Sequence, residues 1–291
     1  MPTSDATPPP SPAVTAEAVR ARDVLATALD EVAGWLLDIS GDLEVTAKHD
    51  GTPVTDADVE VDDRLRARLG EAFPAHGILS EERGTLAPDT TWTWVIDPVD
   101  GTSNFTNRLP YWCVSVALLF EGHPVLGVVD APVLGRRYSG IAGRGAEVTS
   151  RTTSLDGRHD LARTRPLRVR PAVDWRDRRN NHVPLMLTTG TAKRVRGAGL
   201  SLNPRVMGST AIDLAVVAEG VAAASIARVP KVWDIAAGAL LVREAGGAVV
   251  TIGDEPLLPL VGGQEQDGRA AVTAAGPDEG YVRALAEQLL S

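Results

Sequence analysis

Residues 94–105, with the sequence WVIDPVDGTSNF, constrain the fold more than any other part of this chain. A short apolar strand leads directly into Asp97. Pro98 lacks the N–H group that would continue a strand ladder, so we predict that the strand stops there. The turn that follows can direct Asp97 and Asp100 toward one point, and Gly101 then opens a short helix. Two carboxylates and a helix start must therefore lie together at the end of one strand.

Two carboxylates held close together repel each other unless a cation lies between them. Hard oxygen ligands of this kind favour Mg²⁺. The free N–H groups and the positive dipole end of a helix starting at Gly101-Thr102-Ser103 would form an anion site beside the metal. The spacing alone is equally compatible with an Asx-Pro turn followed by a capped helix.

Three other acidic segments are weaker signals when each is taken by itself. Glu81 and Glu82 follow a short apolar run, and acids at a strand end are commonly just solvated. Asp56 and Asp58 stand at a predicted helix start, and Asp234 opens another. Acids at helix starts are ordinary partners of the helix dipole.

Composition limits the kinds of partner. The 291 residues include 38 Asp and Glu against 29 Lys and Arg, a formal net charge of -9. This balance argues against a nucleic-acid polymer, whose binding requires clustered Lys and Arg. A small anionic substrate remains possible if metal ions, backbone N–H groups or a single basic residue meet it locally. The hydrophobic share of 44% allows a sizeable core, in one large domain or two ordinary ones.

Cysteine usage and the absence of long apolar runs indicate the compartment. Cys113 is the only cysteine and lies in an apolar run, so we expect a buried thiol and no internal disulfide. This suits a reducing cytosol, and we predict a cytoplasmic protein. The first twelve residues lack the basic and apolar regions of a secretory signal, and no run approaches about 18 apolar residues. No membrane association is expected.

The chain is predicted to consist of a disordered tail (1–12), an N-terminal half (13–160) and a C-terminal half (161–291) in one compact two-lobed unit. Helices are predicted at 13–39, 56–72, 209–219, 234–245 and 278–290, and an extended pair at 43–55. Strands are predicted at 77–79, 93–96, 113–120, 124–130, 184–189, 222–226, 247–252 and 271–275. We expect His123 to lie in a turn. We interpret the Arg-, Asp- and Thr-rich residues 151–182 as a surface crossover.

Taken in order and spacing, the acidic segments resemble the inositol monophosphatase family of Mg²⁺-dependent, Li⁺-sensitive phosphatases. Residues 94–105 fit the signature of an aromatic and two apolar residues followed by Asp-Pro-x-Asp-Gly-Thr-x-Asn-Phe. The run Trp233–Gly238, followed by Glu244-Ala245-Gly246-Gly247, fits the second signature. The resemblance covers residues 14–290 and implies an α/β (α+β) fold, a layered α-β-α-β-α sandwich, in a protein that is usually a homodimer.

The resemblance also implies two to three Mg²⁺ ions with defined ligands. Glu81 and Asp97, with the backbone carbonyl of Val99, would hold one ion. Asp97 would bridge to a second ion that Asp100 and Asp234 also bind. A third, weaker ion would lie near Glu81.

Further roles implied by the resemblance concern phosphate and water. Gly101, Thr102 and Ser103 would bind the phosphate, and Asp58 with Thr102 would orient and deprotonate the attacking water. Lys48 matches a family lysine near the metal loop. In this chemistry metal ions neutralise the phosphate dianion and make hydroxide available near neutral pH. Water would attack in line without a phosphoenzyme, so the predicted catalytic residues are Asp58, Thr102 and Glu81.

The substrate side departs from the family pattern. Inositol phosphatases commonly carry an acidic residue seven positions before the Asp of the second signature, where this chain has Ala227. A methyl group cannot accept a hydrogen bond from a polyol, and losing an acceptor for a buried hydroxyl weakens discrimination. Arg228 and Lys231 stand nearby; they could meet a second phosphate or be solvated.

The predicted substrate-binding residues are Gly208, Ser209 and Thr210, which match the family's Gly-Ser/Thr-x-Ala site, together with Arg228 and Lys231. The segment 188–207 looks shorter than the family's usual substrate-facing segment. We predict a phosphomonoesterase acting on a small phosphorylated metabolite, with an inositol 1-phosphate-like substrate favoured. Histidinol phosphate, 3'(2'),5'-bisphosphate nucleotides and fructose 1,6-bisphosphate are the alternatives.

Two hypotheses of other classes were weighed. Asp56-Ala57-Asp58-Val59 fits the Asp-x-Asp pattern of haloacid-dehalogenase-type enzymes, which form an aspartyl-phosphate. That motif requires a preceding apolar strand, but residues 48–55 are polar and include Pro53. A non-catalytic binding module on the same fold is the other alternative, and the full set of acidic residues argues against it.

Overall fold

The computed structural model describes residues 10–39, 45–47, 53–86, 91–153, 160–193, 200–253, 258–260 and 272–290. The predicted role of Lys48 and residues 1–9 of the predicted tail lie outside these residues. Within them, no helix is long and apolar enough to cross a membrane.

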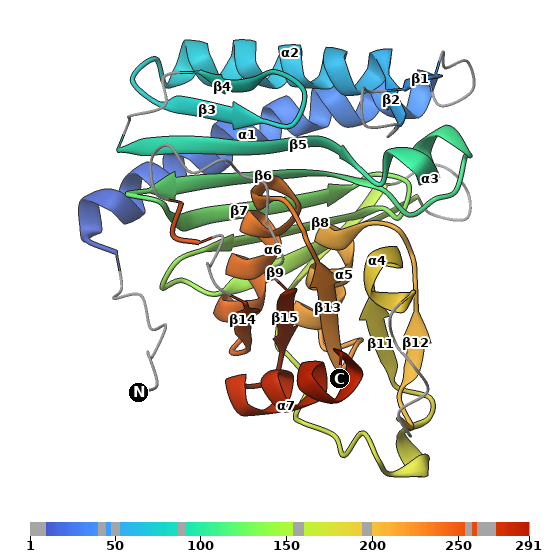
Figure 1. Cartoon of the computed structure of the whole chain (residues 1–291). Coiled ribbons are helices and arrows are strands. Elements are labelled where there is room, and N and C mark those ends of the chain that lie inside the picture. Colours follow the sequence, from blue (N-terminus) through green and yellow to red (C-terminus); the bar gives the residue numbers. More distant parts are fainter. Residues whose placement is uncertain are drawn as a thin grey trace.

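The described strands form a two-stranded ribbon and two larger sheets (Figure 1). The ribbon pairs β1 (Val45–Ala47) with β2 (Pro53–Thr55), as the predicted extended pair required. In order of pairing, the eight-stranded sheet contains β10 (Asp160–Pro166), β9 (Ala146–Thr153), β8 (Arg136–Ile141), β7 (His123–Ala131), β6 (Cys113–Phe120), β5 (Trp92–Asp100), β3 (Gly77–Ser80) and β4 (Gly84–Leu86). The five-stranded sheet contains β12 (Asn203–Arg205), β11 (Pro184–Leu187), β13 (Ala224–Arg228), β15 (Val272–Gly276) and β14 (Ala248–Ile252).

The described helices are α1 (Pro12–Ile39), α2 (Asp56–Ala72), α3 (Thr102–Thr106), α4 (Thr189–Ala192), α5 (Thr210–Ala218), α6 (Val232–Glu244) and α7 (Glu279–Leu290), with a 3-10 turn at Arg178–Asn180. The apolar stripe of α1, from Val14 to Leu36, is buried, because its residues recur at helical spacing. The first N–H groups of α1 meet Ser11, whose hydroxyl accepts from Val14 and whose carbonyl accepts from Thr15.

The elements stack in five layers (Figure 1). The helices α1 and α2 cover one face of the eight-stranded sheet, where they share a core with β5, β6 and β7. The helices α5 and α6 pack between the two sheets, and α7 covers the outer face of the five-stranded sheet against β14 and β15. This arrangement confirms the predicted α-β-α-β-α sandwich.

Three local predictions were wrong, and some strands were missed. Residues 151–153 and 160–166 are not surface crossover: β9 and β10 pair antiparallel, with Thr153 opposite Asp160 and Glu147 opposite Pro166. Their charged and Thr-rich composition suits the exposed edge of a sheet, where such side chains discourage pairing with other chains. The strands β4, β8 and β12 were also not predicted. His123 begins β7 instead of lying in the preceding turn.

The strand β5 does not stop at Pro98 but continues to Asp100. Its register against β6 shifts in this stretch, since Asp97 pairs with Ser115 and Asp100 pairs with Cys113. Two residues of β5 therefore oppose the single residue Val114. A bulge of this kind leaves a position without a ladder partner, which is where a proline can be accommodated.

Candidate active site

The acidic residues meet because β3 and β5 are neighbouring parallel strands, with Ser80 opposite Ile96. Glu81 and Asp97 follow these two residues, so they lie at the same edge of the sheet. The Glu81 N–H donates to the carbonyl of Ile96 at 3.2 Å, which extends the ladder by one step. The predicted convergence of Glu81 with the acids of β5 thus follows from strand pairing.

The bulge in β5 directs its two acids. The Asp97 Oδ1 accepts from the Val99 N–H at 3.1 Å, and the residue is 2% exposed. Asp100 is also buried, and its Oδ2 accepts from the Ser209 hydroxyl at 2.7 Å and from the Ala211 N–H at 2.6 Å. Two groups at the start of α5, in the second half of the chain, therefore donate hydrogen bonds to a carboxylate of the first half.

The predicted residue Ser209 is buried in this contact. Besides donating to Asp100, its hydroxyl accepts from the Ile212 N–H at 3.3 Å and so caps α5. Gly208 precedes it with φ of 90°, and a Cβ there would lie 2.8 Å from the Asn104 side chain. The structure thus gives this segment a positioning role toward Asp100; its contact with substrate stays a prediction.

Asp58 and Thr102 are brought together from elements that are distant in sequence. Asp58 lies in the first turn of α2 and is 2% exposed. The Thr102 hydroxyl, at the start of α3, is 3.2 Å from Asp58 Oδ1 and 3.0 Å from the Val99 carbonyl. Its single proton can be donated to either oxygen.

Gly101 allows the chain to turn from β5 into α3. Its φ is 96°, a left-handed conformation that favours glycine. A Cβ at this position would lie 3.0 Å from the Tyr111 carbonyl. The helix predicted to open at Gly101-Thr102-Ser103 is present, with Gly101 as its N-cap residue.

Asp234 joins the cluster from the first turn of α6. Its Oδ2 accepts from the Lys231 N–H at 2.8 Å. The Ser115 hydroxyl of β6 donates to the Trp233 carbonyl at 3.3 Å, which ties the start of α6 to the strand beside Asp97. Asp234 therefore stands at the same sheet edge although it is far away in sequence.

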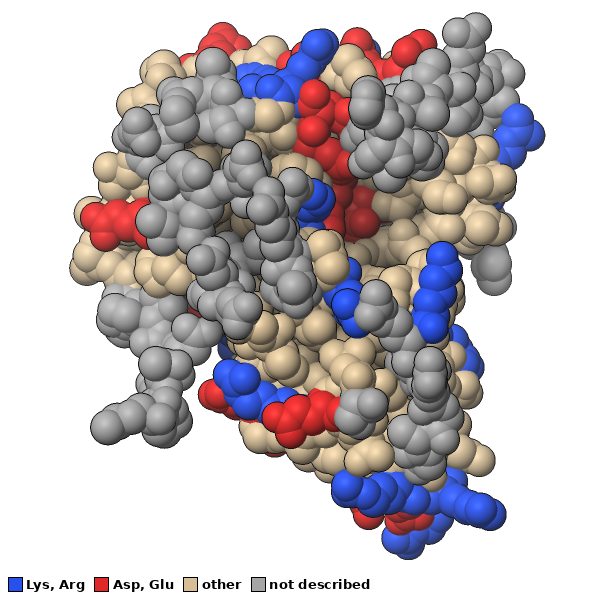
Figure 2. All heavy atoms as spheres, viewed as in Figure 1, with Lys and Arg blue, Asp and Glu red and all other residues tan. Residues whose placement is uncertain are grey.

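The burial and proximity of these acids raise the pKa values of Asp97 and Asp234. Burial raises the pKa of Asp97 well above its usual range, and the charges of the neighbouring carboxylates Glu81, Asp100, Asp234 and Asp58 raise it further. The pKa of Asp234 is raised in the same way, by burial first and by Asp100 next. Figure 2 shows acidic side chains gathered in a hollow of this face, with basic side chains at its edge.

Comparison with known proteins shows which family this chain belongs to. The inositol monophosphatase family model matches residues 13–289. A histidinol-phosphatase of Mycobacterium tuberculosis is 38% identical over 216 residues, which cover 72% of this chain and 78% of the relative. An inositol-1-monophosphatase of Mycobacterium leprae is 38% identical over 236 residues, which cover 75% of each chain. The chain belongs to the inositol monophosphatase family.

Solved structures agree on the fold. An IMPase/NADP phosphatase complexed with Mg²⁺ and phosphate matches with a TM-score of 0.72 at 20% identity, over 94% of this chain and 96% of that chain. Members of the inositol monophosphatase family are phosphatases, so this chain is a phosphoric monoester hydrolase. Family membership also sets aside the aspartyl-phosphate and non-catalytic alternatives.

The donor set of this inositol monophosphatase family member fits divalent cations. Five carboxylates converge, and the charges that raise the pKa of Asp97 are all carboxylate charges. Oxygen-rich, negatively charged sites of this kind bind hard cations such as Mg²⁺. In the described residues no three Asp, Glu, His or Cys side chains are grouped closely enough to hold a metal ion as they stand. Oxygens of Asp97, Asp100 and Asp234 instead accept bonds from backbone N–H groups.

The predicted substrate side carries basic rather than acidic groups. Ala227 is 1% exposed and pairs with Thr273 within the sheet, so this position offers no acceptor to a ligand. Arg228 and Lys231 are partly exposed on either side of Val229 and Pro230. Val229 has φ of 50°, which is a strained conformation for a β-branched residue. Strain of this kind clusters at ligand-binding sites.

Asn104 has a structural role that the sequence interpretation did not assign. Its side-chain Nδ2 donates to the Tyr111 carbonyl and to the Met207 carbonyl, both at 2.7 Å. This side chain therefore connects the loop after α3 to the segment that precedes α5. The sequence signal for this role was the position of Asn104 within the signature at residues 94–105.

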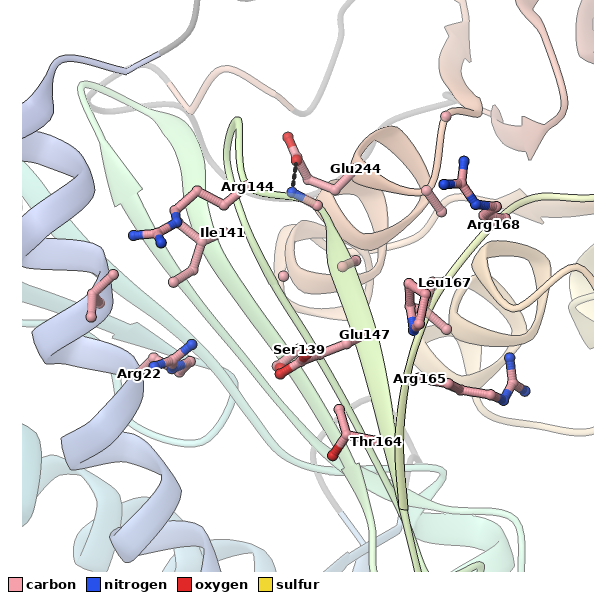
Figure 3. Close-up of a pocket in the computed structure, with 17 residues that line it drawn as sticks. Arg22, Ser139, Ile141, Arg144, Glu147, Thr164, Arg165, Leu167, Arg168 and Glu244 are labelled. Carbon is pink, nitrogen blue, oxygen red and sulfur yellow. Dashed lines mark hydrogen bonds between the residues drawn. The ribbon is translucent and has the colours of Figure 1, made fainter.

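A second hollow, of about 550 Å³, lies away from the acidic cluster among α1, the β8–β9 turn, β10 and the end of α6 (Figure 3). Most of the charged side chains described around this hollow already have ion-pair or hydrogen-bond partners. Arg165 pairs with a glutamate at the end of α5, and Arg22 with the next residue of α1. Both oxygens of Glu244 accept from glycine N–H groups. Arg144 and Arg168 stand on opposite sides of the hollow, so they do not form one anion site.

Proposed function

We propose that this protein is a Mg²⁺-dependent phosphomonoesterase that hydrolyses a small phosphorylated metabolite by direct attack of water. The observation that carries the proposal is the convergence of Asp58, Glu81, Asp97, Asp100 and Asp234 at one sheet edge. The related structure with Mg²⁺ and phosphate supports the choice of metal, because it has the same fold.

In the proposed site, Glu81 and Asp97 would hold one ion with the Val99 carbonyl, and Asp97, Asp100 and Asp234 would hold a second. A third ion near Glu81 completes the proposed set of two to three. When bound, Mg²⁺ neutralises phosphate charge and lowers the pKa of water. The bulge in β5 supports this arrangement, because Asp97, Val99 and Asp100 all lie in its irregular stretch of the ladder.

The remaining steps belong to the chain's own groups. The Asp58 carboxylate and the Thr102 hydroxyl, 3.2 Å apart, are placed to orient water and take its proton. Gly101, Thr102 and Ser103 present N–H groups at the start of α3 to the phosphate oxygens. Because Thr102 contacts both Asp58 and Val99, the water-orienting pair is fixed relative to the proposed metal ligand.

An inositol 1-phosphate-like ester is the proposed substrate, with Arg228, Lys231 and the Gly208–Thr210 segment facing the leaving group. Histidinol phosphate is the second candidate. The buried Ala227 supports it, since no acid stands there for polyol hydroxyls, and so does the relative named histidinol-phosphatase. The two relatives are equally identical to this chain, at 38%, so identity does not choose between these substrates.

The test is phosphate release from a panel of esters by the purified full-length protein. It contains inositol 1-phosphate, histidinol phosphate, fructose 1,6-bisphosphate and 3'-phosphoadenosine 5'-phosphate, each with Mg²⁺, with EDTA, and with Mg²⁺ plus Li⁺. We expect Mg²⁺-dependent, Li⁺-sensitive release. Equal rates in Mg²⁺ and EDTA would refute the proposal. We further propose a cytoplasmic homodimer, which light scattering and cell fractionation test.

A further inference from the structure

The helix α2 carries two buried acids one turn apart, and only the first belongs to the proposed site. Asp58 and Asp62 are four residues apart, so both project from the same face of the helix. They are 2% and 0% exposed. Asp58 contacts Thr102, whereas Asp62 contacts Ser80 at the end of β3.

Asp62 is the centre of a set of polar contacts made through its Oδ2, while its buried Oδ1 has no hydrogen-bond partner among the described residues. Its Oδ2 accepts from the Ser80 hydroxyl at 2.9 Å and from Arg66 Nε at 3.1 Å. Arg66 Nη2 donates to the Ser80 hydroxyl at 2.7 Å and to the Gly84 carbonyl at 2.6 Å. The Arg66 side chain is only 15% exposed. We call Asp62, Arg66 and Ser80 the α2–β3 network.

The α2–β3 network is hydrogen-bonded to both ends of the turn that carries Glu81. Ser80 and Gly84 are the paired residues that close the β3–β4 turn. Arg66 bonds to both of them, so it holds the two ends of the turn at once. Ser80 immediately precedes Glu81, and its hydroxyl also accepts from the Arg83 N–H at 3.3 Å. A shift of this turn would move the Glu81 carboxylate relative to Asp97.

A neighbouring ion pair provides a natural comparison. Asp63 and Arg83 also join α2 to the same turn, at 2.7 Å, but both side chains are about half exposed. An exposed ion pair is screened by solvent and contributes little. Solvent screens the buried α2–β3 network much less. The planar guanidinium of Arg66 also donates in fixed directions, so it holds its acceptors in one geometry.

We propose that Asp62, Arg66 and Ser80 are positioning residues that hold Glu81 in place for Mg²⁺, so that α2 sets both the water-orienting side and the metal-binding side of the site. This inference rests on the proposed function. Groups behind a metal ligand commonly orient it in this way.

The experiment compares Ser80→Ala, Arg66→Lys and the control Asp63→Asn in the full chain. Ser80→Ala removes one hydroxyl and leaves the Asp62–Arg66 pair in place. Arg66→Lys keeps the charge but cannot reproduce the planar fork. Calorimetric titration of Mg²⁺ without substrate gives the metal affinity, and circular dichroism in EDTA shows that each variant is folded at the assay temperature.

We expect the Mg²⁺ affinity to fall by about 10–100-fold in Ser80→Ala and Arg66→Lys, the usual effect of losing such a contact, and to stay unchanged in Asp63→Asn. Phosphate release by Ser80→Ala should recover at high Mg²⁺ concentration, because Glu81 itself is retained. Wild-type affinity in both network variants, or an equal loss in Asp63→Asn, would overturn the inference. If the wild-type protein binds no Mg²⁺, the proposed function fails instead.

Discussion

We expect Asp100→Asn to stabilise the metal-free protein at high pH and to make it less stable than wild type when Mg²⁺ is present. Burial raises the pKa of Asp100 from its ordinary 3.8 to about 6, against the lowering effect of the bonds from Ser209 and Ala211. The folded, metal-free protein therefore holds this proton more tightly than the unfolded chain. That stabilisation is full below pH about 4 and is lost as the pH rises through about 6. The difference corresponds to about 3 kcal/mol.

The assay is urea unfolding of wild type and Asp100→Asn in EDTA and in Mg²⁺, between pH 3.5 and pH 8. The amide cannot ionise, and its oxygen can still accept from the same two donors. In EDTA the variant should match wild type near pH 3.5, exceed it by about 1.5 kcal/mol at pH 5 and exceed it by about 3 kcal/mol at pH 8. In Mg²⁺ at pH 8 the order should reverse, because binding to the folded state stabilises wild type. A difference between the two proteins that does not change with pH or metal would refute this reasoning.

Three further predictions concern packing, a buried ion pair and catalysis. Gly238→Ala places a methyl group 2.6 Å from a leucine of α5 and should cost about 1–3 kcal/mol in urea unfolding, whereas Gly34→Ala, where nothing lies within 4 Å, should be neutral or stabilising. Arg137→Met leaves its buried partner Asp130 without both 2.9 Å contacts and should cost about 3–5 kcal/mol in the same measurement; a cost below 1 kcal/mol would show that the pair is solvated. Thr102→Ala should lower kcat by about 10²–10⁴-fold with little change in unfolding free energy, and an equal loss in Thr106→Ala, a half-buried position of the same helix, would count against a specific role.

The acidic centre was predictable because its signal is local. Asp97, Asp100 and Gly101 are adjacent in sequence, and a strand followed by a helix start already implies that two carboxylates lie near free N–H groups. Asp58 and Asp234 carried no such signal, since acids at helix starts are common. Only the resemblance to the family joined them to the site, and the structure then brought them to one sheet edge.

Other features depend on contacts that the sequence does not display. Nothing in the pattern separates Asp62 from Asp63, yet one is buried against β3 and the other is exposed. The four-residue spacing from Asp58 was the only available hint. The strand β10 was missed because its arginines and threonines lack alternation, as an exposed edge strand permits. Pro98 suggested a strand end because the bulge that accommodates it depends on the register of β6.

The most direct test of the central claim is phosphate release by Asp97→Asn in Mg²⁺, with circular dichroism to confirm the fold. The pKa of Asp97 is raised by burial and by the charges of all four other acids, Glu81, Asp100, Asp234 and Asp58. Losing a shared metal ligand removes several kcal/mol of charge stabilisation, so turnover should fall by more than about 10³-fold. A folded Asp97→Asn protein with a rate near that of wild type would contradict the account.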